Sequence, residues 1–278
     1  MSETLRAIAA FALPFEWASH GFMLNALAAI LILSPLLGAL STLVVSNRLA
    51  YFSDAIGHSA LTGVALGAVL GLADASWAVV AFSLLLALVI VGLRRRGRSG
   101  AETVIGIISS TAVALGIVVL SRGGGFARYS AYLVGDILSV APADLGRALA
   151  LAAAVWVLWA LFFNKLLLAS VNEGLARSRG LATAALEYGL ALAIAAVVAL
   201  SIRWTGILVV NALLALPGAT ARNLARGTRS YHAIAVLAST LSSLAGLVLS
   251  YYLDTATGAT MVLVGALLYA ASGFFRRR

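Results

Sequence analysis

The chain has 278 residues, of which 62% are hydrophobic and only 10% are charged. A soluble globular domain carries about 25% charged residues, so this composition excludes an ordinary soluble fold and predicts an all-α, polytopic transmembrane helix bundle. Cysteine is absent, which excludes disulfides and thiolate metal sites.

The first 20 residues are expected to form a short leader that is not a cleavable signal peptide. Glu3 and Glu16 interrupt the apolar residues there, and Pro14 breaks the run. Residues 21–278 are expected to form one transmembrane domain, because no polar stretch within them is long enough to fold independently.

Apolar segments long enough to cross a bilayer, which takes roughly 20 residues, fill most of this domain. They lie at about 22–45, 55–72, 76–93, 103–120, 143–163, 182–200, 231–252 and 258–275. A shorter segment, 205–219, ends in Pro217-Gly218 and is either a further span or a broken helix packed inside the bundle. The sequence therefore predicts eight or nine spans.

The net charge of +9 reflects arginines gathered in short segments between the apolar runs. If all nine segments cross, these clusters fall on one side of the membrane, as the positive-inside rule requires. We therefore expect an outside N-terminus, a cytoplasmic C-terminus and no nucleic-acid partner. The clusters are Arg94–Arg96 with Arg98, Arg222 with Arg226 and Arg229, and Arg276–Arg278.

Asp54 and His58 form the most unusual polar pair, in the segment YFSDAIGHSALTGVALGAVLG at 51–71. Positions four apart share one face of a helix. Ionisable groups inside a membrane indicate a functional site, and a carboxylate with an imidazole suits Zn²⁺, Mn²⁺ or Fe²⁺. Two ligands suit weak coordination along a pathway, and a homodimer would double them to four. The structural alternative is that Asp54 caps a helix and His58 bonds to a backbone carbonyl.

Gly63, Gly67 and Gly71 follow this pair at a spacing of four. At about 100° per residue they fall on the side of the helix opposite Asp54 and His58. Small residues at this spacing allow another helix to approach closely in lipid. We expect the glycines to pack against a neighbouring helix.

The sequence has no P-loop, since its single lysine, Lys165, follows no glycine-rich loop. Energy for any transport must then come from a partner or an ion gradient. The polar stretch at 170–180 is either a solvated loop or a short helix along the membrane face that suits docking.

Four stretches resemble the membrane-spanning permease subunit of zinc/manganese/iron-type ABC importers. They occur in the order of that family and cover most of the chain. The family often carries a proline where this chain has Thr62. The stretches are residues 51–67, YLVGDILSVAPADL (132–145), NEGLARSRGL (172–181) and GILVVNALLALPGATARNLAR (206–226).

The resemblance implies a type II ABC importer permease that works as a homodimer in the bacterial cytoplasmic (inner) membrane. It implies two cytoplasmic ABC ATPase subunits and an extracytoplasmic metal-binding protein as partners. Asp54 and His58 would meet the transported metal, and no cofactor would be bound permanently. A cytoplasmic coupling segment at about 170–181 would dock on the ATPase through Glu173, Gly174, Leu175, Ala176 and Arg177.

Two acidic residues stay open at this level. Glu187 either pairs with a cytoplasmic arginine, which we favour, or lines the pathway. Asp136 is expected to cap a local turn, with metal entry or contact with the binding protein as the alternative. A proton-coupled secondary transporter with Asp54, His58 and Glu187 as a relay is the competing function, whereas a membrane enzyme lacks a sufficient polar cluster.

Overall fold

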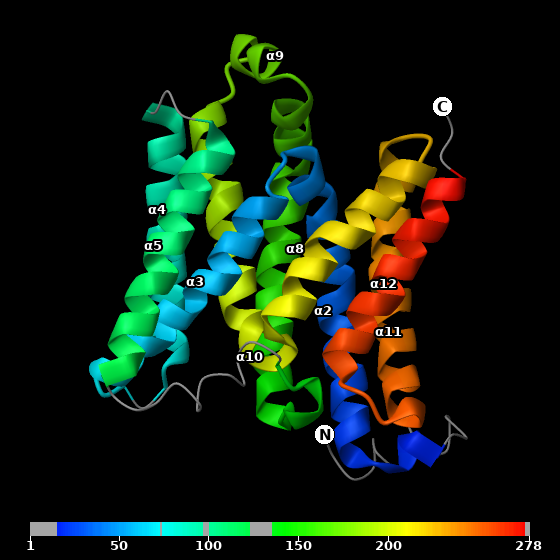
Figure 1. Ribbon diagram of the computed structural model, residues 1–278. Coiled ribbons are helices and arrows are strands. Elements are labelled where there is room, and N and C mark those ends of the chain that lie inside the picture. Colours follow the sequence, from blue (N-terminus) through cyan, green and yellow to red (C-terminus); the bar gives the residue numbers. More distant parts are fainter. Residues whose placement is uncertain (1–15, 73, 97–99, 123–134, 276–278) are drawn as a thin grey trace. The chain divides into compact units, whose positions relative to one another are not determined.

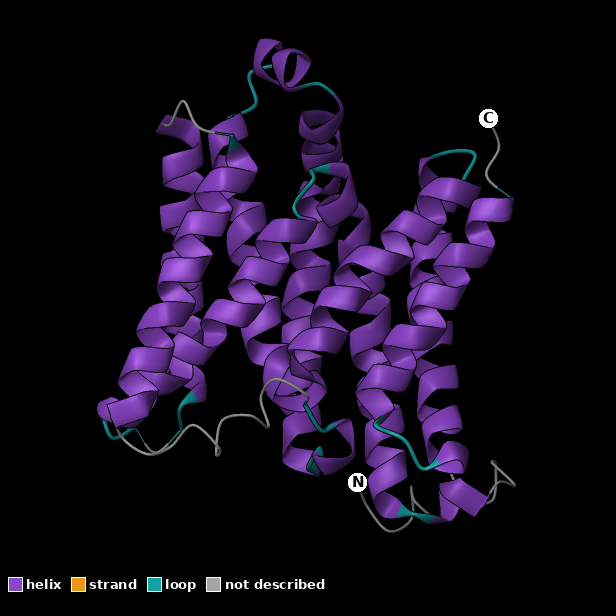
Figure 2. Ribbon diagram, in the orientation of Figure 1, coloured by secondary structure: helices purple, strands orange, loops and turns teal. Residues whose placement is uncertain are grey.

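The computed structural model describes residues 16–72, 74–96, 100–122 and 135–275, and within these ranges the chain is helical, without a strand (Figure 2). Most of the expected leader therefore lies outside the described residues, as does part of the 132–145 stretch. The helices in Figure 1 are η1 (Glu16–Ser19), α2 (Gly21–Ser46), α3 (Ala50–Val69), α4 (Ser76–Arg96), α5 (Ala101–Arg122), η2 (Ile137–Ser139), α8 (Pro142–Val171), α9 (Glu173–Ser178), α10 (Thr183–Leu224), α11 (Thr228–Leu253) and α12 (Thr257–Phe274).

Seven of the described helices are long and apolar enough to cross a membrane: α2, α4, α5, α8, α10, α11 and α12. The described part of the chain is thus all-helical, and the chain is a multi-pass membrane protein, as its composition predicts. Helix α3 is outside this set although its 20 residues suffice in length, because its polar and small residues lower its hydropathy.

Helix α10 is 42 residues long and contains one break, at Gly206. A continuous helix of that length would extend about 63 Å, twice the roughly 30 Å core of a bilayer. Gly206 leaves the helical region with φ 78° and ψ 161°, a conformation that glycine adopts without a Cβ clash. The expected segments 182–200 and 205–219 imply a loop at 201–204, which is wrong, since those residues are helical and the break lies at Gly206.

The end expected at Pro217-Gly218 is also wrong, because the helix continues to Leu224. Proline removes one backbone hydrogen bond but is tolerated in membrane helices where neighbouring groups satisfy the freed carbonyl.

The chain packs as two compact units. Unit 1 comprises Met1–Thr42, Val134–Trp156 and Trp204–Arg278, and unit 2 comprises Leu43–Leu133 and Val157–Arg203. The expected metal ligands and the expected coupling segment both belong to unit 2, so their surroundings can be described within that unit.

In unit 1, close helix contacts depend on small residues. A Cβ built on Gly38 of α2 would lie 2.8 Å from the Cβ of Ser239 in α11, and one on Gly246 of α11 would collide with Met261 of α12. The Ser239 hydroxyl also donates to the carbonyl of Ser34 at 2.7 Å. Because both residues are buried, this hydrogen bond satisfies polar groups that would otherwise be unpaired in the helix interface.

In unit 2, α3 packs against α4 through two of the expected glycines. A Cβ on Gly63 would lie 2.6 Å from the Cα of Val79, and one on Gly67 would lie 3.1 Å from the Cβ of Ala78. Gly71 differs, because α3 ends at Val69 and Gly71 adopts φ 65° with no atom within 4 Å of a built Cβ. It lies in the turn after the helix rather than in the contact.

Candidate functional site

Asp54 and His58 lie one turn apart on α3. The Nε2 atom of His58 is 3.5 Å from Oδ1 of Asp54, and the side chains are 47% and 44% exposed, respectively. Helix α3 begins at Ala50, earlier than the expected 55, and its N-cap residue is Leu49. Asp54 is therefore inside the helix, so the alternative in which it caps the helix is wrong.

Most of α3 around this pair is buried, which makes the exposure of the pair distinctive. Phe52, Ser53, Ile56 and Gly57 are all buried within unit 2. Asp54 and His58 thus lie on the exposed side of α3, next to the exposed Tyr51, on a helix that is otherwise largely buried. A half-exposed carboxylate and imidazole can meet an ion or a second protein chain without first being uncovered.

A single chain does not complete a metal site around the pair. Among the residues that the structure describes, no group of three or more His, Cys, Asp or Glu side chains could hold a metal ion. The transition metals that accept imidazole and carboxylate ligands are usually held by three or more protein groups in stable sites. The pair by itself suits weak and transient coordination.

The N-terminal end of α3 opens on a polar cavity of about 180 Å³ in unit 2. Leu49, Arg94, Glu173, Thr183 and Glu187 are among its lining residues. Asp54 lies five residues beyond Leu49, about 8 Å along the helix axis. The Asp54/His58 pair is consequently near the end of the unit that carries α9.

Helix α9 forms most of the expected coupling segment, which is helical rather than a loop. The Oδ1 atom of Asn172 accepts a hydrogen bond from the backbone N–H of Leu175 at 2.9 Å and caps the helix. Ala176 is fully buried and anchors one face, whereas Gly174 and Leu175 are exposed on the other. The segment is thus a short, capped helix with one buried and one exposed face.

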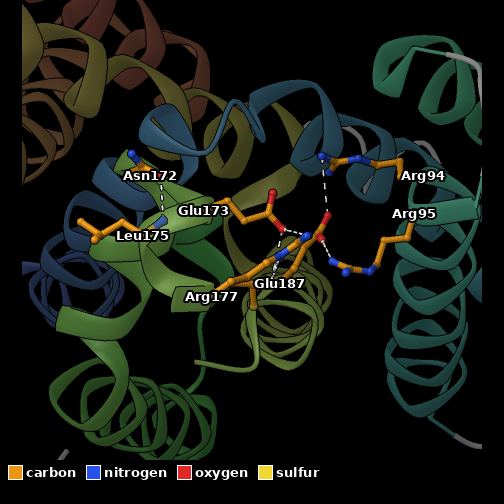
Figure 3. A network of polar contacts seen from close by, with 8 residues as sticks. Arg94, Arg95, Asn172, Glu173, Leu175, Arg177 and Glu187 are labelled. Atoms are coloured by element: carbon orange, nitrogen blue, oxygen red, sulfur yellow. Dashed lines mark hydrogen bonds and ion pairs between the residues drawn. The ribbon is translucent and has the colours of Figure 1, made fainter. Parts of the chain in front are cut away.

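A polar network holds α9 to the start of α10 (Figure 3). The guanidinium of Arg177 donates to Oε1 of Glu173 at 2.5 Å, and the Thr183 hydroxyl donates to the same oxygen at 3.2 Å. Nε of Arg177 in turn donates to the Thr183 hydroxyl at 3.3 Å. The hydrogen bond from Arg177 lowers the pKa of Glu173, against a smaller opposing effect of burial.

Glu187, one turn after Thr183, joins α10 to the C-terminal end of α4 (Figure 3). Its Oε2 atom lies 2.7 Å from Nη1 of Arg95, and its Oε1 atom lies 3.7 Å from Nη2 of Arg94. The expectation that Glu187 pairs with an arginine is confirmed.

Thr183 is the member of this network that the sequence does not indicate. It is ten residues from Glu173, in a stretch whose spacing alone gives no reason to bring the two together. Only the turn between α9 and α10 does so, with Gly180 at φ 75°. The glycine in the short turn between α9 and α10 is the sequence feature that could have indicated this approach.

Asp136 has the structural role expected of it. Its Oδ1 atom accepts a hydrogen bond from the backbone N–H of Leu138 at 3.0 Å and caps η2. It also lines a cavity of about 170 Å³ in unit 1, together with Thr205 and Thr257.

Comparison with known proteins places this geometry among transport proteins. The family described as the ABC 3 transport family matches residues 19–276. The chain is 34% identical to the high-affinity zinc uptake system membrane protein ZnuB of Haemophilus influenzae, over 89% of this chain and 95% of that protein. It is 30% identical to the manganese transport system membrane protein MntC of Halalkalibacterium halodurans, over 92% and 88%, respectively.

A solved structure shares the fold. PsaBC from Streptococcus pneumoniae in complex with Fab matches with a TM-score of 0.80 and 27% identity. The match covers 98% of this chain and 95% of the other.

Proposed function

Because the chain belongs to the ABC 3 transport family, we propose that it is the permease subunit of an ABC importer that carries a divalent transition metal into the cytoplasm. The family match over residues 19–276 carries this proposal, and the relatives named for zinc and manganese give the class of substrate. The chain supplies the path, and ATP hydrolysis belongs to two partner ATPase subunits.

The metal would meet Asp54 and His58 on the exposed side of α3. The pair is accessible, and within one chain it lacks further ligands among the described residues. Two copies of the permease that face each other would bring four donors to one path. Such a site would bind Zn²⁺, Mn²⁺ or Fe²⁺ only as long as the four donors remain close, and separation would release the ion.

Two kinds of partner would complete the transporter. The exposed face of α9, with Glu173, Gly174, Leu175 and Arg177, would dock on the ATPase, and an extracytoplasmic metal-binding protein would deliver the ion. Residues 21–278 would form the membrane domain after the leader at 1–20, with 170–181 as the coupling segment.

Nine crossings of the cytoplasmic membrane would suit this arrangement. They comprise the six strongly apolar helices other than α10, α3 as a seventh, and the two parts of α10, divided at Gly206, as the eighth and ninth. Arg94, Arg95 and α9 would then share the cytoplasmic side, in agreement with the positive-inside rule.

The relay alternative is less well supported by the structure. A relay would need the Glu187 carboxylate to be free for Asp54 and His58, whereas both of its oxygens contact arginines of α4. Uptake driven by an imposed pH gradient in the absence of ATP would favour the relay.

The proposed function can be tested in proteoliposomes that contain the permease, its ATPase and the metal-loaded binding protein. We expect ATP-dependent uptake of zinc or manganese, and we expect Asp54→Ala and His58→Ala each to abolish it while the ATPase still co-purifies. Normal uptake by both variants would remove the pair from the pathway.

A further inference from the structure

Two ion pairs join α4 to the first part of α10, one near each end of the helices. The inner pair is Glu187 with Arg95, and Arg94 contacts the other oxygen of the same carboxylate. The outer pair consists of Asp74 and Arg203, whose Oδ1 and Nη1 atoms are 3.8 Å apart. Sixteen residues separate Glu187 from Arg203, which corresponds to about 24 Å along the helix.

The inner pair is shielded from water more than the other charged contacts of unit 2. The side chains of Arg95 and Glu187 are 29% and 28% exposed, whereas those of Arg177 and Glu173 are 60% and 52% exposed. Removing one partner of an ion pair costs more where the charges are partly withdrawn from water, because the remaining charge is left unpaired there. Glu187 therefore fixes the two helices to each other at this end.

The outer pair uses one carboxylate for two purposes. Oδ1 of Asp74 accepts a hydrogen bond from the backbone N–H of Ser76 at 3.0 Å, and it also faces the guanidinium of Arg203. The Asp74 carboxylate thus holds the N-terminal start of α4 and joins that start to α10 through Arg203. A shift of α10 along its axis must move the N-terminal end of α4 or break this contact.

Helix α9 is coupled to the same assembly. Glu173 and Arg177 both contact Thr183 in the first turn of α10, and Thr183 precedes Glu187 by one turn. A displacement of α9 therefore reaches α10 first and α4 through Glu187. From α4 it reaches α3, because Gly63 leaves no space between α3 and Val79.

We infer that Glu187 and Asp74 are positioning residues that make α9, residues 183–203 of α10, and α4 move as one body during transport. This inference rests on the proposed function, in which α9 docks on an ATPase. The two ion pairs link the docking helix to the helix that carries Asp54 and His58, so that ATP hydrolysis and metal passage stay coupled. Neither Glu187 nor Asp74 contacts the metal in this arrangement.

The test uses the full complex in proteoliposomes and measures metal ions imported per ATP hydrolysed. Glu187→Gln removes the inner charge. Asp74→Asn removes the outer charge but keeps a side-chain oxygen that can accept the same hydrogen bond from Ser76, since asparagine and aspartate form the same kind of turn. We expect each variant to retain the ATPase subunits and basal ATP hydrolysis while the ratio of import to hydrolysis falls about fivefold, that is, by about 1 kcal/mol of coupling.

The matched control is Asp144→Asn. Asp144 also caps the start of a helix, through the backbone N–H of Ala141, and also lies 3.8 Å from an arginine, Arg147. That pair lies within α8 alone, so its loss should leave the ratio unchanged. If Asp74→Asn reduces the yield of folded protein, Arg203→Gln breaks the same pair and leaves the cap of α4 in place.

The outcomes separate the two proposals. A wild-type ratio in Glu187→Gln and in either outer variant overturns the inference and leaves the proposed function standing. An equal fall in the Asp144→Asn control also overturns it, because the effect would then not be specific to contacts between helices. Absence of ATP-dependent metal import by the wild-type complex overturns both.

Discussion

The hydroxyl of Thr62 in α3 donates a hydrogen bond to the backbone carbonyl of Ala112 in α5, with 2.5 Å between the two oxygen atoms. Gly116 makes this approach possible, because a Cβ there would lie 2.6 Å from the same hydroxyl oxygen. A proline at this position would offer neither the hydroxyl nor a backbone N–H. Thr62 therefore ties α3 to α5 by a side-chain bond.

Replacing Thr62 with valine should weaken this contact while keeping the side-chain shape. Hydrogen bonds between membrane helices contribute roughly 0.5–2 kcal/mol, so we expect a lower thermal midpoint in detergent. Thr111→Val is the control, because the Thr111 hydroxyl bonds to the carbonyl of Ile107 in its own helix. Equal midpoints for the two variants would contradict the assigned role.

Gly63→Ala should destabilise unit 2 by overpacking. The added methyl group would meet the backbone of Val79, which cannot move aside as a flexible side chain would. Overpacking of this kind costs about 1–3 kcal/mol. Gly189→Ala provides the comparison, since no atom lies within 4 Å of a Cβ built there. Thermal unfolding should separate the two variants, and similar midpoints would argue against a tight α3–α4 contact.

Exchange of the two charges on α9 should weaken binding of the ATPase. The double variant Glu173→Arg with Arg177→Glu keeps an ion pair at the same spacing, so that α9 can still fold. It reverses the charges that the exposed face presents, because both side chains are more than half exposed. We expect reduced co-purification of the ATPase subunits, measured as the ratio of bands after affinity purification. An unchanged ratio would exclude these charges from the interface.

The order of α9 should depend on pH through Glu173. The Arg177 guanidinium lowers the pKa of this carboxyl below its ordinary value of 4.5, so the charged form is the one that the folded segment favours. Its stabilising effect is present above pH 4.5 and is lost as the pH falls through the lowered pKa. We expect the difference in thermal midpoint between the wild type and Glu173→Gln to shrink on acidification over this range. A difference that grows with acidification would reverse the assignment.

The composition and spacing of residues determined the class of protein and the location of its helices. Long apolar runs must be helical in lipid, because every backbone polar group needs a partner within the segment. Asp54 and His58 were also evident from sequence, since two ionisable groups at helical spacing stand out in such runs. The expected pairing of Glu187 with an arginine followed from the excess of arginine on one side.

Only the tertiary structure decided how these parts meet. It showed that α10 breaks at Gly206 rather than in a loop, that Gly71 lies beyond the glycine contact, and that Thr183 joins α9 to α10. It also attached α4 to α10 through Asp74 and Arg203, residues that are far apart in sequence. Helical periodicity fixes which residues share a face, but the partner of that face depends on packing between segments distant in the chain, and local sequence does not encode that partner.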